Sequence, residues 1–194
     1  MTPAPRVVRF RAPHRAPRST NSILFPLDLA SQRAGVAVPA ARQIAPSRIP
    51  PPYDMLLVHE REMTSTLERH FDTTLVVRVL SAWTRGRWYY RRSLLAQELS
   101  GRPVAMGMVR LNMYAFSARV CAQIVRGETP LGRILHNAGL RYHSRPRTFL
   151  EIAPTSEMMG VFWMRECRPL YGRQTDVTLT GERIGNIIEV LPLV

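Results

Sequence analysis

The pattern of hydrophobic and polar positions changes at about residue 53. Residues 1–52 show neither a helical nor an alternating period over any useful length, and they hold ten of the 16 prolines. A segment of this composition buries too little apolar surface to offset the entropy of ordering it. We therefore predict a disordered Arg/Pro-rich tail at residues 1–52 and one folded domain at residues 53–194.

Six segments have the composition and turn spacing of β-strands. β-branched and aromatic residues are concentrated in them, and turns that contain glycine separate several of them. Gly86 and Gly101 divide the first three into an antiparallel meander, and Thr180-Gly181 predicts a hairpin between the last two. The expected strands cover residues 74–80, 88–98, 104–112, 147–152, 170–179 and 183–191.

Three helices are expected between these strands. Ser65 and Glu68 have the spacing of a capping box, which marks the start of a helix. Thr129 and Pro130 are residue types favoured at an N-cap and at the first helical position. The helices begin near residue 64 and cover residues 118–126 and 131–137. Strands grouped in this way, without strand–helix–strand alternation, indicate an α+β fold with one antiparallel sheet of about six strands.

The formal net charge of +13 would ordinarily indicate a nucleic-acid partner. Eight arginines fall in residues 1–50 against the single acid Asp28, so about half of the excess belongs to the predicted tail. A basic strand with interleaved aromatics at residues 83–92 leaves single-stranded nucleic acid as an alternative. Adjacent aromatics on a strand more often pack in the core, so we expect no nucleic-acid partner.

The rest of the composition indicates a soluble protein of the cytoplasm. No apolar run approaches the roughly 20 residues of a membrane-spanning helix, and no membrane association is expected. The two cysteines, Cys121 and Cys167, lie far apart without metal-binding spacing, which favours free thiols in a reducing compartment. The chain contains no Walker loop, GxGxxG, GxSxG or HExxH motif, so we expect neither a cofactor nor a metal.

Three charged residues on predicted strands are candidates for a binding site. Glu189 lies in an apolar strand, where a carboxylate must be paired, hydrogen-bonded or protonated, unless it is on a solvent-facing edge. Arg91 and Arg92 are adjacent and must point to opposite faces of the sheet, so one of them is expected inside, where its guanidinium matches a carboxylate. Arg110 on the next strand is a candidate second cation. For each arginine, the alternative is a solvent-facing side chain.

Four segments, in this order and spacing, resemble the chorismate pyruvate-lyase family. The match runs from about residue 53 to the C-terminus. The segments are MTSTLE at 63–68, WYYRRSLL at 88–95, TPLGRIL at 129–135, and LYGR at 170–173 with IEVLP at 188–192. The resemblance implies a single antiparallel sheet with short helices that cover an internal ligand pocket.

The resemblance also implies roles for individual residues. Arg91 matches the arginine that anchors the ring carboxylate of the substrate, and Glu189 matches the glutamate at the ring hydroxyl. Met63 and Leu131 match positions whose backbone amides approach the ligand, and Gly132 adjoins Leu131 in the same motif. The implied activity is elimination of pyruvate from chorismate to give 4-hydroxybenzoate or a related hydroxybenzoate, by a monomer and without a cofactor.

A second hypothesis from the same resemblance is a non-catalytic module that binds small aromatic acids. The fold also serves as the effector-binding domain of bacterial transcription regulators, where it follows a helix-turn-helix domain. Residues 1–50 have no helical period long enough for such a domain, which favours the enzyme. Two departures from the family concern single residues: Arg110 comes two residues later than the family's arginine, and Arg92 stands where many relatives have an acid.

Overall fold

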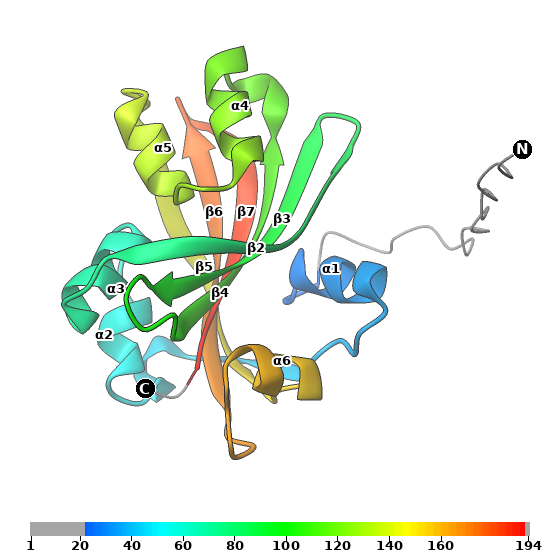
Figure 1. Cartoon of the computed structure of the whole chain (residues 1–194), viewed down its shortest axis with the longest axis vertical. Coiled ribbons are helices and arrows are strands. Elements are labelled where there is room, and N and C mark those ends of the chain that lie inside the picture. The colour runs from blue at the N-terminus through cyan, green and yellow to red at the C-terminus, as the bar shows by residue number, and fades with distance from the viewer. Residues whose placement is uncertain (1–21, 193–194) are drawn as a thin grey trace, which may run out of the picture.

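The computed structural model describes residues 22–192 as one antiparallel sheet with helices on both faces (Figure 1). In this part of the chain the sheet has seven strands, in the order β1-β5-β6-β7-β4-β3-β2, and every neighbouring pair is antiparallel. The strands are β1 (Ala41–Ile44), β2 (Leu75–Arg85), β3 (Trp88–Gln97), β4 (Pro103–Asn112), β5 (Tyr142–Ile152), β6 (Leu170–Leu179) and β7 (Glu182–Leu191). The predicted α+β class and single antiparallel sheet are confirmed, with one strand more than expected.

The predicted turns at Gly86, at Gly101 and at Thr180-Gly181 all connect neighbouring strands of the sheet. β2, β3 and β4 are neighbours in the sheet, and Gly86 makes the first turn with a φ of +58°. Thr180 and Gly181 join β6 to β7, and both have positive φ, at +50° and +87°. Two residues with positive φ match the right-handed twist of paired strands, so this turn fixes the hairpin register.

Residues 22–52 belong to the domain, which corrects the predicted boundary at residue 53. Helix α1 (Leu27–Ala34) and the buried Phe25 pack on the sheet, and β1 (Ala41–Ile44) pairs with β5. The prediction failed because a four-residue edge strand and an eight-residue helix between prolines are too short to produce a recognisable period. The rest of the predicted tail, residues 1–21, lies outside the described residues.

Five more helices follow α1. They are α2 (Tyr53–Leu57), α3 (Met63–Phe71), α4 (Ala118–Arg126), α5 (Leu131–Asn137) and α6 (Ser156–Val161), with single 3-10 turns at Pro46–Arg48 and Met113–Ala115. The predicted α3, α4 and α5 are confirmed, and α1, α2 and α6 were not predicted. Pro130 is itself the N-cap of α5, in place of Thr129. Within residues 22–192, no helix is long and apolar enough to cross a membrane.

The expected capping box at the start of α3 is absent. Glu62 is the N-cap residue, and the Ser65 hydroxyl donates to its backbone carbonyl at 3.2 Å. The Glu68 carboxylate instead accepts the backbone N–H of Leu75, at 3.0 Å, where β2 begins. Glu68 therefore links the end of the helix to the sheet.

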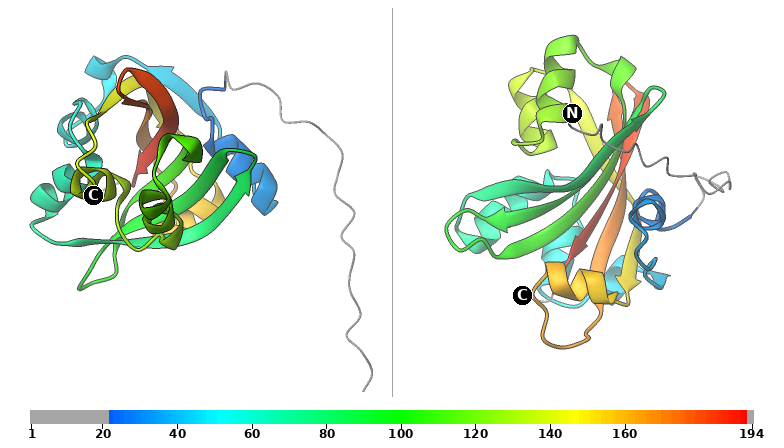
Figure 2. Two further views of the ribbon diagram at one scale, coloured as in Figure 1. Left: turned by 90° about the horizontal axis from the view of Figure 1, so that it is seen from above. Right: turned by 45° about the vertical axis from the view of Figure 1, so that its right-hand side comes forward.

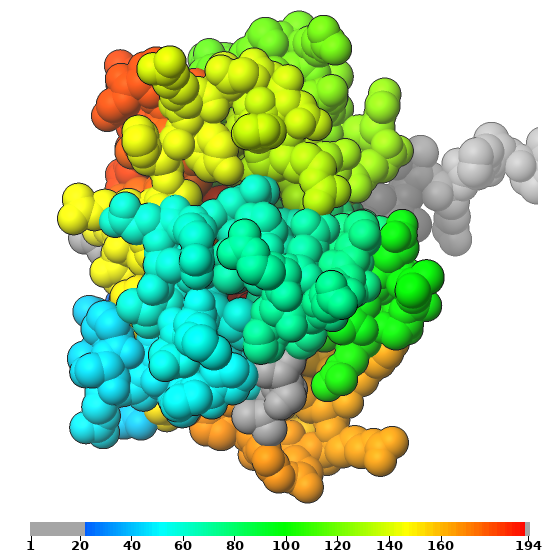
Figure 3. Space-filling model, turned by 90° about the vertical axis from the view of Figure 1, so that its left-hand side faces the viewer, coloured from blue at the N-terminus to red at the C-terminus, as the bar shows by residue number. Residues whose placement is uncertain are grey.

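The helices divide between the two faces of the sheet (Figures 1 and 2). α1 and α6 cover one face and share a single apolar cluster with it. On the other face the apolar residues form two clusters, one beneath α2 and α3 and one beneath α4 and α5. Figure 3 views this face, where the two helical pairs meet over the sheet. The strip of sheet between the two clusters holds the candidate site.

Candidate functional site

A cavity of about 90 Å³ lies between the two apolar clusters, enclosed by the sheet and by the N-terminal ends of α3 and α5. Its apolar wall includes Leu95, Val109 and Ile187. The structure places five of the six residues proposed from the sequence around this one cavity. They are Met63, Arg91, Leu131, Gly132 and Glu189.

Gly107 forms the floor of the cavity and was not proposed from the sequence. It lies in the middle of β4, paired with Ser93 on one side and Glu189 on the other. A Cβ atom at Gly107 would meet nothing within 4 Å, whereas at Gly172 and Gly185 it would come within 2.5 and 2.3 Å of backbone oxygens. The absence of a side chain at Gly107 therefore leaves room in the cavity, which no neighbouring backbone fills.

Arg91 lies at one end of the cavity and has few partners of its own. Its side chain is 3% exposed, and one terminal nitrogen donates to the carbonyl of Ile124 at 3.3 Å. This carbonyl belongs to the last turn of α4, where the helix dipole favours a cation. The Nε–H of Arg91 and the hydroxyl of Tyr89 are both buried without a partner. Burial lowers the pKa of Arg91, and Tyr89 opposes this effect.

The other two buried arginines of the sheet are each paired with a carboxylate. Arg92 points to the opposite face from Arg91 and forms an ion pair with Glu157 of α6. Arg173 is 1% exposed and donates its Nε–H to Glu189 at 2.6 Å. We expected one of Arg91 and Arg92 to be buried, and in the structure both are, on opposite faces of the sheet. Among the buried arginines of the described residues, Arg91 is the one without a carboxylate.

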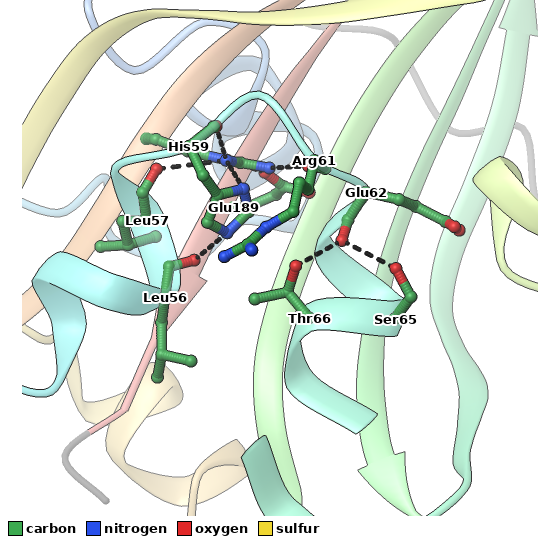
Figure 4. Close-up of polar contacts among 9 residues, drawn as sticks. Leu56, Leu57, His59, Arg61, Glu62, Ser65, Thr66 and Glu189 are labelled. Atoms are coloured by element: carbon green, nitrogen blue, oxygen red, sulfur yellow. Dashed lines mark hydrogen bonds and ion pairs between the residues drawn. The ribbon is translucent and has the colours of Figure 1, made fainter. Parts of the chain in front are cut away.

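Arg173 fastens the loop between α2 and α3 to the sheet; Figure 4 labels the loop residues that it contacts. Its guanidinium donates to the backbone carbonyls of Leu57, His59 and Arg61, at 3.1, 2.7 and 3.4 Å. Because the same group also holds Glu189, the position of that carboxylate depends on the loop. Glu189 is thus held on one side by Arg173 and faces the cavity on the other.

His59 completes this cluster as a neutral ring. Its Nε2 lies 2.9 Å from the carbonyl of Leu56, which can only accept, so Nε2 carries the proton. Nδ1 is then free to accept from Arg173, at 3.3 Å. Burial lowers the pKa of His59, and the charge of Arg173 lowers it further. The ring therefore supports the loop in its uncharged form.

Glu62 and Tyr142 lie near Glu189 at the mouth of the cavity. Both also line a wider surface groove of about 650 Å³. The Glu62 carboxylate lies against Gly132, where an added Cβ would be 2.1 Å from its Oε1. Burial raises the pKa of Glu62, and burial with the nearby charges of Glu62 and Glu189 raises the pKa of Tyr142 to about 12. Neither residue was proposed from the sequence. Glu62 was passed over because a carboxylate before a helix usually faces solvent.

Arg110 is not at the cavity, and the prediction that it adds a second cation there was wrong. Its guanidinium stacks on Trp88, 3.5 Å from the ring centroid, and lies 5.3 Å from the ring of Phe25. These contacts are on the face covered by α1. Side chains alternate along a strand, so Arg110 points away from the face to which Gly107 and Val109 belong.

The cavity is lined by polar groups of several kinds. In residues 22–192, no three or more His, Cys, Asp or Glu side chains are placed to hold a metal ion. The polar groups that reach the cavity are a guanidinium, carboxylates and hydroxyls.

Comparison with known proteins gives a likeness in structure alone. No protein-family model matches the sequence, and no curated protein matches it significantly. The solved structure of PhnF from Mycobacterium smegmatis matches with a TM-score of 0.52 and 9% identity, over 69% of this chain and 64% of that one. At this identity the likeness shows the fold only. It supports the resemblance noted in the sequence at the level of the fold.

Two further matches have lower TM-scores. A possible transcriptional regulator, YydK from Bacillus subtilis, matches at 0.48 with 11% identity, over 62% of this chain and 58% of that one. The ligand-binding domain of a protein from Bordetella bronchiseptica, assigned to the GntR family of transcriptional regulators, matches at 0.45 with 14% identity, over 61% and 85%.

These comparisons correct the prediction of a chorismate pyruvate-lyase to a likeness in fold. No family model and no curated protein matches the chain, and the likeness to PhnF at 9% identity brings no activity with it. The prediction failed because its motifs, such as the one at 129–135, place backbone around a cavity. A domain that only binds a ligand needs the same arrangement.

Proposed function

We propose that this chain is a small-molecule-binding module whose cavity takes a small organic acid without converting it. The observation that carries the proposal is Arg91, which is buried at the cavity and has no carboxylate partner among the described residues. An unpaired buried charge is costly, and a ligand carboxylate would supply the missing partner through charged hydrogen bonds.

The size of the cavity favours a ligand with about one ring. One water needs roughly 10–15 Å³ of such space, so 90 Å³ corresponds to roughly six to nine water-sized groups. The Cα atoms of Arg91 and Glu189 lie two strands apart and two residues out of register, which is roughly 11–12 Å by ordinary sheet spacing. After the two side chains are allowed for, the remaining span suits a ring with substituents at both ends.

The setting that we propose is cytoplasmic, which suits the two unpaired cysteines. Benzoate and hydroxybenzoates are the simplest members of the ligand class, and chorismate is a larger one that would bind without reacting.

Titration calorimetry of the full chain with benzoate and with benzamide tests the proposal. The two compounds have the same shape, but only benzoate carries the charge that Arg91 requires. We expect benzoate to bind at least about tenfold more tightly, a difference of about 1.4 kcal/mol. Equal binding of the two compounds, or no binding of either, would contradict the proposal. Release of pyruvate from chorismate would contradict its non-catalytic part.

A further inference from the structure

The two ends of the cavity differ in charge. Arg91 lies at one end, where its guanidinium donates to the last turn of α4. Glu62 and Glu189 lie near Tyr142 at the other end, close enough that both carboxylates act on its ionisation. Since Glu189 already has Arg173 as its partner, the acidic end keeps one carboxylate without a counterion.

The Glu62 carboxylate has neither a hydrogen bond nor an ion pair to any described residue. Figure 4 shows the Glu62 carboxylate turned away from His59 and Glu189, while the backbone carbonyl of Glu62 accepts from Ser65 and Thr66. Arg133, the cation that acts most strongly on Glu62, instead binds Glu68 with two hydrogen bonds of 2.9 and 3.0 Å. Glu62 is half-buried at the point where the cavity meets the surface groove.

Other groups near Glu62 do not replace a counterion. Arg133 and His136 of α5 favour its charged form, whereas burial, Glu68 and Glu189 all oppose it, with burial the largest effect. A carboxylate held in this way is stabilised by a cation that arrives with the ligand, because such a cation offers both charge and hydrogen-bond donors. The mouth of the cavity also leaves an ammonium group partly hydrated, which reduces the cost of its desolvation.

We propose that the ligand is an amino-substituted acid, with its carboxylate at Arg91 and a protonated amine at Glu62. This inference rests on the proposed function and names the ligand class of the same cavity. It makes Glu62 the residue that distinguishes amines from hydroxyl compounds of equal shape. A hydroxyl group can donate only one hydrogen bond to Glu62 and brings no charge.

The test compares 4-(aminomethyl)benzoate with 4-(hydroxymethyl)benzoate by calorimetric titration of the full chain. The two compounds differ only in the group that would reach Glu62. We expect the amine to bind about tenfold or more tightly than the alcohol. Glu62→Gln keeps the shape of the side chain and should remove this preference while the alcohol still binds.

Glu60→Gln is the matched control. Glu60 lies two residues away, is mostly exposed, and lines the surface groove but not the cavity. This variant should keep the preference for the amine. An alcohol that binds as tightly as the amine, or a preference that survives in Glu62→Gln, would overturn the inference. If benzoate still binds more tightly than benzamide in that case, the proposed function stands and only the amine inference fails. If benzoate does not bind more tightly, the proposed function and the inference both fail.

Discussion

At the scale of single residues, the charged groups of the cavity are held in different ways. Glu189 is paired with Arg173, whereas Arg91 has no carboxylate partner and Glu62 no cation partner among the described residues. Arg91 and Glu189 could be proposed from the sequence because a charge within an apolar strand needs a partner. Glu62 could not, since its burial depends on Gly132 in a helix some 70 positions later in the chain. The prediction for Arg110 was wrong because the sequence did not show which face of the strand carries the cavity, and Arg110 points to the other face. Charge within a strand is visible in a sequence, but the face to which it points is not.

The burial of Glu62 has a consequence for stability. A carboxyl group whose pKa is raised in the folded protein favours folding in its protonated form. Its contribution is fully present below the pKa of the unfolded chain and is lost as pH rises through the higher pKa of the folded state. At neutral pH the protein therefore holds Glu62 at a cost, as is common where a site must bind a ligand.

Gly107 provides a prediction at the same scale. Gly107→Val should fill the floor of the cavity and weaken benzoate binding by about tenfold or more. It should not destabilise the fold, because glycine inside a strand is about 0.5–1 kcal/mol less favourable than alanine and no atom lies within 4 Å of the added Cβ. Calorimetric titration and urea unfolding measure the two effects.

Gly160→Ala in α6 is the control for Gly107→Val. An added Cβ at Gly160 also meets nothing within 4 Å, but the residue lies on the opposite face of the sheet from the cavity. Its benzoate binding should not change. Unaltered binding in Gly107→Val would show that the ligand lies elsewhere.

At the scale of elements, α3, α4, α5 and the six long strands were predictable because each has a period or a turn signal of its own. β1 was not, since a four-residue strand is defined by its pairing with β5 rather than by its own pattern. The loop between α2 and α3 was equally invisible. Its position depends on Arg173, more than 110 residues away, which donates to three of its carbonyls.

Arg173→Met provides a prediction at this scale. The change leaves Glu189, whose side chain is 13% exposed, without its cation and releases the loop that carries His59. Removal of one partner from a buried pair typically costs about 3–5 kcal/mol, and we expect a loss of that order in the free energy of unfolding by urea. Arg42→Met, which breaks the exposed pair with Glu151, should change the free energy of unfolding far less, because solvent screens that pair. A similar small loss in both variants would show that Arg173 does not hold the loop.

At the scale of the whole molecule, the fold and the site are connected through one face of the sheet. α1 and α6 cover one face with a continuous apolar cluster, while the four helices on the other face leave a gap between two clusters. That gap is the cavity, and Arg91 lies at its edge with no carboxylate partner among the described residues. The resemblance in sequence extended to this architecture but not to catalysis, because the motifs that carry it shape a cavity and do not define a reaction.

The central claim is that Arg91 binds a ligand and does not stabilise the fold. Its most direct test is Arg91→Met, examined by benzoate titration and by urea unfolding. We predict that benzoate binding weakens by about 10- to 150-fold, the value of a lost charged hydrogen bond of about 1.5–3 kcal/mol. The free energy of unfolding should stay the same or rise, because a buried charge without a carboxylate partner is replaced by an apolar side chain of similar length. A marked loss of stability with unchanged benzoate binding would contradict the account and identify Arg91 as a structural cap of α4.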